Sequence, residues 1–525
     1  MPAMAVVTDN LPNDVEALKA LFIQQQALVA EQQTQLRRQD AQITSLREQL
    51  NILLAKRFGP SSEKSHSDQL GLFNEAESAI DAKDTPEATE ETVTVPSHDR
   101  KKPGRKPLPD YIERVEVLHD LPEAEKVCPH DGTALERIGE EVSEQLDVIP
   151  AKVQVLRHIR PKYACPCCRE GIKTAKLPPQ PIPKSIASPG LLAHVCTAKY
   201  ADALPLYRQE SILQRAGVEL PRATLAGWML KLGDLVLPLI NLLRDHLLGD
   251  DYLQMDETTV QVLKQPEKAP TAKSYMWVQR GGPPDRPIIL FDYDPSRSQA
   301  VPLRLLEGFA GYLQCDGYDG YAAVGRREDI VLVGCWAHAR RKFDEAVKAQ
   351  GKNGKAKAGR ATKGLALVQK LYRVETLAKE CSPQERLALR QEQTVPVLNE
   401  MRAWLDKALP EVPPQSAVGK ALHYVDGQWP KLVRYVEDGR IAIDNNAAER
   451  AIRPFVIGRN NWLFSDTRKG AEASARLYSL ITTAKANGHE PYRYLRHVFK
   501  ELPAATSVED FEALLPFNLD AGSLD

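Results

Sequence analysis

The stretch DYLQMDETTVQVL, residues 251–263, alternates apolar and polar side chains, and this period of two is typical of a half-buried β-strand. Two further strand-like stretches follow, SYMWVQR (274–280) and RPIILFDY (286–293), and the links between them carry Gly and Pro. Short links of this kind join antiparallel neighbours. The sequence therefore predicts a sheet that begins with three antiparallel strands.

The chain then alternates strands with helices. A helix in SQAVPLRLLEG (298–308) leads to a strand in GYLQCDGYDGYAAV (311–324) that ends at Asp316, and IVLVGCWAHARRKFDEAV (330–347) passes from a strand into a helix. Three antiparallel strands followed by crossover connections are the ribonuclease-H-like order. In that order the fourth strand lies beside the first, which brings Asp316 near Asp256 in the middle of the first strand.

Two neighbouring carboxylates are costly unless a cation neutralises them. A pair of divalent ions does so, and two such ions are a common device for in-line attack on a phosphodiester. These sites usually include a third acid, and Glu449 fits that role from a helix in DNNAAERAI, which we expect Asp444 to cap. The alternatives are an ion pair at the strand edge for Asp256 and a helical pair with Arg453 for Glu449, worth a few tenths of a kcal/mol.

The N-terminal segment, residues 1–64, carries a heptad pattern. Alternating steps of four and three from Leu11 to Leu53 meet apolar residues at ten of thirteen positions, and the other three are Gln. This pattern predicts a coiled coil for self-association into a homo-oligomer. The alternative is an amphipathic helix that lies on the body of the protein itself.

Residues 65–109 lack periodicity and are mostly acidic, which predicts a disordered linker. The segment ends in KKPGRKPLP, where prolines keep the backbone extended while Arg105 and Lys106 project. That shape fits the narrow minor groove of DNA. The alternative is a basic linker end without a specific ligand.

Residues 110–180 resemble a zinc ribbon. CPHDG and YACPCC lie at the tips of strand-like stretches, and zinc needs four ligands in a tetrahedron. The predicted ligands are Cys128, Cys165 and Cys168, with His130 or Asp131 as the fourth. The alternative is a ribbon that has lost its metal and is held by packing. Eight cysteines in this arrangement favour a reduced compartment over a disulfide framework.

Residues 181–247 predict a helix-turn-helix. Helical spacing in YRQESILQR stops at Ala216 and Gly217 and resumes after Pro221. The second helix carries Arg222 and Thr224, which we expect to face the major groove of DNA. Any αα-hairpin gives a similar pattern, but the preceding ribbon and basic segment favour DNA binding.

Length and charge set limits on the remaining possibilities. A chain of 525 residues is too long for one core and predicts several domains. Its 69 basic and 70 acidic residues nearly cancel, so total charge indicates no partner. The N-terminus lacks a basic and apolar leader, and the apolar run near residues 228–243 is interrupted by charges. We expect a cytoplasmic protein without a membrane segment.

The chain resembles transposases of the insertion-sequence-66 family over nearly its whole length. The resemblance rests on CPHDG, YACPCC, YLQMDET, CDGYDGYAAV, GCWAHARRKF and the long segment DNNAAERAIRPFVIGRNNWLFSDTRKGAEASARLYSLITTAKANG. It implies an Asp-Asp-Glu transposase whose catalytic and metal-binding acids are Asp256, Asp316 and Glu449. It also implies two Mg²⁺ ions, with Mn²⁺ as an alternative, and small accessory proteins from the same element. Asp131 departs from a four-cysteine ribbon, which leaves the zinc prediction open.

The resemblance completes the expected architecture, a multidomain α+β protein with a coiled coil, a zinc-ribbon-like module, a helix-turn-helix and a ribonuclease-H-like core interrupted by a helical insertion. The expected parts are 248–345 and 440–490 for the core, 346–439 for the insertion and 491–525 for a helical tail. The predicted phosphate contacts around the acids are His338, Arg340, Arg341, Arg450, Arg453 and Arg459. His338 has the alternative of a helix-start histidine satisfied by backbone, and Trp462 is expected to fill the core rather than stack on a base.

These expectations combine into one predicted activity. The protein binds double-stranded DNA at the ends of its own element and at a target, and it cuts and joins strands with divalent metal ions. A DNA-binding regulator whose catalysis has lapsed is the alternative, although none of the three acids is missing. A nuclease of the same fold that cuts without joining is a third possibility.

Overall fold

The structure, a computed structural model, describes residues 14–58, 114–116, 145, 152–163, 172–266, 268–349 and 359–524. The chain divides into two compact units, residues 75–159 and the remainder. The described residues of the smaller unit are exposed and lie outside helices and strands. The predicted minor-groove residues and zinc ligands lie outside the described residues: Arg105, Lys106, Cys128, His130, Asp131, Cys165 and Cys168.

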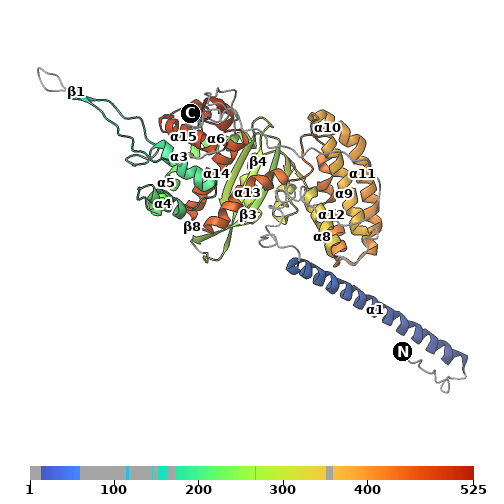
Figure 1. Ribbon diagram of the computed structural model, residues 1–525. Helices are drawn as coiled ribbons and strands as arrows, with labels where there is room; N and C mark the ends of the chain where they lie inside the picture. Colours follow the sequence, from blue (N-terminus) through green and yellow to red (C-terminus); the bar gives the residue numbers. More distant parts are fainter. Residues whose placement is uncertain are drawn as a thin grey trace, which may run out of the picture. The chain divides into compact units, whose positions relative to one another are not determined.

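A mixed sheet forms the centre of the larger unit (Figure 1). Its strands are β3 (Tyr252–Lys264), β4 (Lys273–Gly281), β5 (Ile288–Asp294), β6 (Gly311–Gln314) and β7 (Ile330–Val333). The strand order is β5-β4-β3-β6-β7, with β3, β4 and β5 antiparallel and with β6 and β7 parallel to β3. The predicted strand order and directions are confirmed, although the fourth strand ends at Gln314, two residues before Asp316. The short strand β8 (Ser465–Thr467) pairs with the far end of β3.

Two helices cover one face of the antiparallel strands, α13 (Asn446–Trp462) and α14 (Arg468–Ala486). Phe291 of β5 lies against Phe455 of α13 and Tyr478 of α14, and these two rings also contact each other. All three side chains are buried. Burying such a side chain contributes roughly 1.5–3 kcal/mol, so this cluster fixes both helices on the sheet. Trp462 packs edge-on against Phe455 at 5.5 Å between ring centroids, as a core residue does.

Hydroxyl groups of α14 cover the outer edge of the sheet at β5. Ser479 Oγ accepts a hydrogen bond from the backbone N–H of Phe291 at 2.7 Å, and Thr483 Oγ1 accepts one from Ile289 at 3.0 Å. A free strand edge invites pairing with another chain. These two contacts satisfy the edge of β5 within the molecule.

The predicted helix-turn-helix corresponds to α4 (Leu206–Arg215) and α5 (Arg222–Leu235), and Gly217 between them adopts φ +81°. Their neighbours are α3 (Pro189–Tyr200) and α6 (Leu237–Leu248). Leu225, Trp228 and Leu232 of α5 belong to the same buried cluster as the sheet. This helical part therefore shares its core with the sheet. The C-terminal helices α15 (Pro491–Glu501) and α16 (Val508–Glu512) complete this part, and α15 packs on α3.

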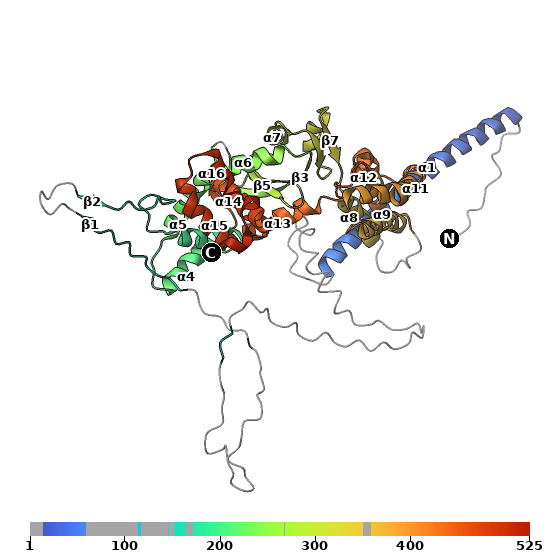
Figure 2. The same cartoon turned by 90° about the horizontal axis from the view of Figure 1, so that it is seen from above.

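The helices of the predicted insertion lie together (Figures 1 and 2), and their buried apolar side chains form a hydrophobic cluster distinct from that of the sheet. Its helices are α9 (Arg360–Leu377), α10 (Pro383–Leu389), α11 (Val395–Ala408) and α12 (Ala417–Leu432). Trp336 and Phe343 of α8 (Trp336–Ala349) are buried in the same cluster. Since α8 directly follows β7, the insertion is built around a helix that the sheet itself positions. The short helix α7 (Ala300–Leu305) links β5 to β6.

The N-terminal segment forms one long helix, α1 (Val15–Phe58). Leu18, Phe22, Val29 and Leu36 of the predicted heptad are each at least 40 % exposed. An exposed apolar stripe of this length is what a coiled-coil partner would cover. Oligomerisation itself stays a prediction.

A two-residue ladder flanks the second cysteine pair. β1 (Lys162–Tyr163) pairs antiparallel with β2 (Lys173–Thr174) on either side of the CPCC segment. The CPCC segment thus lies between two paired strands in the sequence, as predicted for a cysteine pair at the tip of strands.

Among the described residues, no single helix has the length and apolarity of a membrane span; the bent pair α5 and α6 meets those two criteria only when taken together.

Candidate active site

The register of the parallel strands places two of the predicted acids at one level. Gln254 of β3 pairs with Gln314 of β6. Asp256 and Asp316 each lie two residues beyond these partners, and side chains two residues apart face the same side of a strand. Asp316 follows the end of β6, where its Oδ1 accepts a hydrogen bond from the backbone N–H of Tyr318 at 2.9 Å. The pairing of the two strands therefore brings the two carboxylates together.

Glu449 reaches the same place from the first turns of α13. The residue before this helix is Asn445, whose buried side-chain amide donates to the carbonyl of Met255 at 2.8 Å. This bond fixes the start of α13 beside the residue that precedes Asp256. We expected Asp444 to cap the helix, but the N-cap is Asn445, and Asp444 Oδ1 accepts from the N–H of Asn446 at 3.2 Å.

The three acids affect one another electrostatically. The pKa of Asp256 is raised well above its ordinary value by burial first and then by the negative charges of Glu257, Glu449 and Asp316. Within the described parts of the chain, Asp256 forms no ion pair with a Lys or Arg. Its Oδ1 accepts the N–H of Glu257 at 2.8 Å. The strand-edge ion pair that was the alternative for Asp256 is thus not present among the residues that the structure describes.

The neighbouring acid, Glu257, is paired with a cation, although burial and the charge of Asp316 still raise its pKa. Arg297 donates to its Oε1 through Nε at 2.8 Å and through Nη2 at 2.5 Å, and the Tyr321 hydroxyl donates to Oε2 at 2.8 Å. The Arg297 guanidinium also lies 3.6 Å from the ring centroid of Tyr318. Arg297 also interacts electrostatically with Asp316, so this cation lies close to the predicted acids. Neither Glu257 nor Arg297 was given a role from the sequence: Glu257 stands in YLQMDET beside Asp256, and Arg297 stands outside the quoted motifs.

A histidine and a cysteine complete the surroundings of Glu449. His338 Nδ1, on the first turn of α8, lies 4.0 Å from Glu449 Oε1. Burial and the nearby charge of Arg341 lower the pKa of His338 to about 4, so its ring is neutral at pH 7. Cys335 immediately precedes α8, and its Sγ belongs to the same cluster. Cys335 was not among the predicted site residues, although its C-x-x-H spacing from His338 is a signal that can be read in the sequence.

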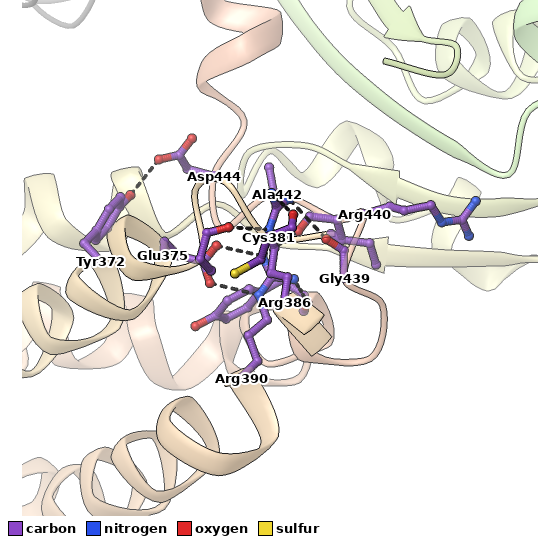
Figure 3. A network of polar contacts seen from close by, with 12 residues as sticks. Tyr372, Glu375, Cys381, Arg386, Arg390, Gly439, Arg440, Ala442 and Asp444 are labelled. Atoms are coloured by element: carbon purple, nitrogen blue, oxygen red, sulfur yellow. Dashed lines mark hydrogen bonds and ion pairs between the residues drawn. The ribbon is translucent and has the colours of Figure 1, made fainter. Parts of the chain in front are cut away.

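A buried arginine holds the segment that leads into α13 (Figure 3). Arg390, fully buried at the start of the π-helical turn Arg390–Thr394, donates to both carboxylate oxygens of Glu375 at 2.9 and 2.8 Å. Its remaining donors bind the carbonyls of Tyr435, Asp438 and Ile441 at 2.7 to 3.0 Å. Every N–H of the guanidinium has a partner, and the bonds of Arg390 to three carbonyls fix the backbone of residues 435–441 against the helices of the insertion.

The sheet binds the residues that follow, 442–444. Gln314 donates to the carbonyl of Ala442 at 2.8 Å, and Gln254 donates to the carbonyl of Asp444 at 3.3 Å. The Tyr252 hydroxyl accepts from the N–H of Ala442 at 3.1 Å. Polar groups buried with their partners define one arrangement of the chain, and here that arrangement determines where Glu449 lies.

The predicted DNA contacts fall into two groups. Arg222, Arg340, Arg341 and Arg450 are exposed, and Thr224 and Arg453 are half-buried. Arg450 lines a hollow of about 330 Å³ together with Arg280 and Lys485, so three basic side chains meet beside the helix of Glu449. Arg459 differs, because its Nη1 donates to the carbonyl of Thr259 and to Thr258 Oγ1 at 3.1 Å, which ties α13 to β3.

Comparison with known proteins now identifies the family. Residues 184–473 match the model described as "Transposase IS66 family", which covers the sheet, the insertion and α13. The chain belongs to the IS66 transposase family. Residues 125–169 match the zinc-finger binding domain of IS66 transposases, 479–517 match the IS66 C-terminal element, and 45–117 match the domain described as "Transposase C of IS166 homeodomain".

Relatives of this chain are found in Sinorhizobium fredii. The uncharacterized protein y4qI is 31 % identical over 548 residues, which is 98 % of this chain and 99 % of the relative. The uncharacterized protein y4jD is 33 % identical over 428 residues, 79 % of this chain and 82 % of the relative. A third, y4hP, is 31 % identical over 443 residues, 82 % of this chain and 79 % of the relative.

The family assignment supports DNA binding and divalent-metal use by this transposase, and the match to the zinc-finger domain supports zinc binding by the segment that contains the predicted ligands. The individual ions and the roles of single residues remain predictions.

Proposed function

We propose that this IS66 transposase binds the ends of its own insertion element and catalyses strand cleavage and strand transfer in a ribonuclease-H-like core. The strand order and directions described above support that core. Asp256, Asp316 and Glu449 are the proposed catalytic residues. The observation that carries the proposal is the meeting of these three carboxylates, from three separate elements, with no Lys or Arg paired to Asp256 among the described residues.

The residues fit Mg²⁺, with Mn²⁺ as an alternative. Mg²⁺ prefers carboxylate oxygens and keeps several waters, and the half-buried acids supply such oxygens beside open solvent. Asp256, Asp316 and Glu449 would hold two such ions. When bound, the ions would activate the attacking water or 3′-hydroxyl and stabilise the leaving oxygen.

The chain's own groups determine where the reaction takes place. The parallel pairing of β3 and β6 holds Asp256 and Asp316 at one level, and the bond from Asn445 to Met255 holds the start of α13 against them. Rigid placement of this kind lowers the entropic cost of aligning a phosphodiester. His338, neutral at pH 7, is a hydrogen-bond partner for a substrate oxygen rather than a cationic phosphate clamp in the free protein.

DNA would reach the acids along the exposed basic residues. Arg450 with Arg280 and Lys485 around the hollow, and Arg340 and Arg341 on α8, would contact phosphates near the acids. Arg453 and Arg459 complete the proposed set, although Arg459 would have to combine a phosphate contact with its bonds to β3.

Element ends would be recognised outside the core. Arg222 and Thr224 at the start of α5 would read the major groove, and Arg105 with Lys106 the minor groove. Zinc, held by Cys128, Cys165, Cys168 and either His130 or Asp131, would order the ribbon. Self-association through α1 would pair two element ends, and accessory proteins of the same element are proposed partners.

The test is cleavage and joining of DNA that carries the native flanks of the gene, with Mg²⁺ and purified full-length protein. The wild type should nick at the element ends and join them to a target, and Asp256→Asn should bind the same DNA without cutting it. If the wild type binds the ends and cuts nothing, even with the accessory proteins, the regulator alternative is the better account. Cutting without joining would favour a nuclease.

A further inference from the structure

Three ligand atoms of different chemistry converge beside the proposed catalytic acids. Cys335 Sγ, a ring nitrogen of His338 and a carboxylate oxygen of Glu449 all lie within 4.8 Å of one another. They come from two elements, since Cys335 and His338 lie at the start of α8 and Glu449 on the first turns of α13. The start of each helix is fixed, α8 by the bond from the Trp336 N–H to the carbonyl of Ile443 and α13 by Asn445.

The thiol lies where backbone donors would support a thiolate. Cys335 Sγ accepts the backbone N–H of Asn445 at 3.3 Å and also interacts with the backbone N–H of His338. Hydrogen bonds to a charged form favour that form. Burial acts in the opposite direction and raises the pKa of Cys335 to about 12, so the free protein carries a neutral thiol. A bound cation would stabilise the thiolate, which burial otherwise disfavours.

The imidazole is available to such a cation. His338 Nδ1 is buried and has no hydrogen-bond partner in the described part of the chain. The His338 side chain as a whole is 24 % exposed and that of Glu449 is 16 % exposed, so solvent reaches the cluster from one side.

We propose that Cys335, His338 and Glu449 form a binding site for a thiophilic divalent cation such as Zn²⁺ or Cd²⁺. Sulfur and imidazole nitrogen suit these ions, whereas Mg²⁺ selects oxygen ligands. Three protein ligands leave a fourth tetrahedral position open to water. One thiolate and one carboxylate neutralise the two charges of the ion. Binding releases the thiol proton to solvent, and no electrons are transferred.

The consequence for activity rests on the proposed function. A thiophilic ion bound at this site occupies Glu449 and withdraws it from Asp256 and Asp316. Zn²⁺ or Cd²⁺ would then inhibit Mg²⁺-dependent cleavage by removing the third acid.

The test is a titration of full-length protein with Cd²⁺, followed through the ultraviolet charge-transfer band of sulfur bound to cadmium. Cysteines of the zinc-finger segment contribute equally to wild type and variants, so the difference between them isolates this site. Wild type should bind one Cd²⁺ more than the Cys335→Ser variant does. The control is Cys381→Ser, which changes a cysteine outside the cluster and should bind as much Cd²⁺ as the wild type. His338→Gln should weaken the same increment, which covers the case that Cys335→Ser does not fold.

Equal cadmium uptake by wild type, Cys335→Ser and His338→Gln would overturn the site. The inhibition is measured separately, as cleavage in Mg²⁺ with added Cd²⁺, each protein being normalised to its own rate in Mg²⁺ alone. Equal inhibition of wild type and Cys335→Ser would overturn the link to Glu449. A cadmium difference band in a protein that cleaves no DNA would support the metal site and count against the transposition chemistry.

Discussion

Replacing Arg390 by Met should destabilise the helical insertion more than any exposed ion pair could. The side chain is fully buried, and its guanidinium forms two bonds to Glu375 and three to backbone carbonyls. Removing one partner of a buried pair costs about 3–5 kcal/mol. Because the Glu375 side chain is 16 % exposed and can regain some hydration, we expect a loss near the lower limit, about 3 kcal/mol.

Arg402→Met is the matched control for this change. Arg402 also belongs to the insertion, pairs with Asp406 and Asp426, and lies over an aromatic ring, Trp429 at 5.3 Å, as Arg390 lies over Tyr435 at 5.0 Å. It is 28 % exposed and its carboxylates are more so. Exposed pairs contribute about 0–1 kcal/mol, so the control should lose no more than about 1 kcal/mol.

The assay is urea unfolding followed by tryptophan fluorescence, since Trp336, Trp404 and Trp429 lie in or against the core of the insertion. Arg390→Met should lower the free energy of unfolding reported by these residues by roughly three times the effect of Arg402→Met. Equal shifts for the two variants would refute the reasoning that the buried network holds the insertion and residues 435–441 together.

Three further changes test separate parts of the account. Asp256→Asn should raise the melting temperature at pH 7 without divalent ions. Because the pKa of Asp256 is raised in the folded state, ionisation of this carboxyl lowers the stability of the folded protein as pH rises above about 4. The difference in melting temperature between wild type and variant should therefore vanish below that pH. Gly311→Ala should lower the free energy of unfolding in chemical denaturation by more than about 1 kcal/mol. Gly311 has φ +133°, and an added Cβ would lie 2.2 Å from the carbonyl oxygen of Asp251. Gly227→Ala is the control and should not destabilise the protein, because its Cβ would meet no atom within 4 Å. Phe22→Asp, on the exposed stripe of α1, should reduce the mass found by light scattering, and an unchanged mass would contradict the coiled coil.

The sequence predicts the sheet well because its signals are local. Alternation of side chains identifies β3, and the hairpin-like links determine that the next two strands are antiparallel. The parallel pairing of β3 with β6 then places Asp256 and Asp316 at the same level. Glu449 was expected as the third acid from its helix and from the family resemblance, but the insertion separates it from the strands and no local pattern indicates which surface its helix contacts.

The contacts that were not predicted are made with partners distant in the sequence. Arg390 reads as an ordinary helix residue, and only Glu375 and the carbonyls of residues 435–441 make it buried and bonded. The phosphate contact predicted for Arg459 stays a prediction, but its bonds to Thr258 and Thr259 of β3 were not foreseen from the basic motif in which it lies. The periodicity of a sequence indicates which face of a helix a side chain lies on, but not which element lies opposite that face.

The most direct test of the central claim is a Mn²⁺ titration of the full-length protein, with free Mn²⁺ measured by electron paramagnetic resonance, because it requires no knowledge of the element ends. Wild type should bind Mn²⁺, and Asp256→Asn, Asp316→Asn and Glu449→Gln should each weaken that binding. Asp466→Asn, which removes an exposed acid paired with Lys264, should bind Mn²⁺ as the wild type does. Equal binding by all five proteins would contradict the assignment of these three acids as the metal-binding centre.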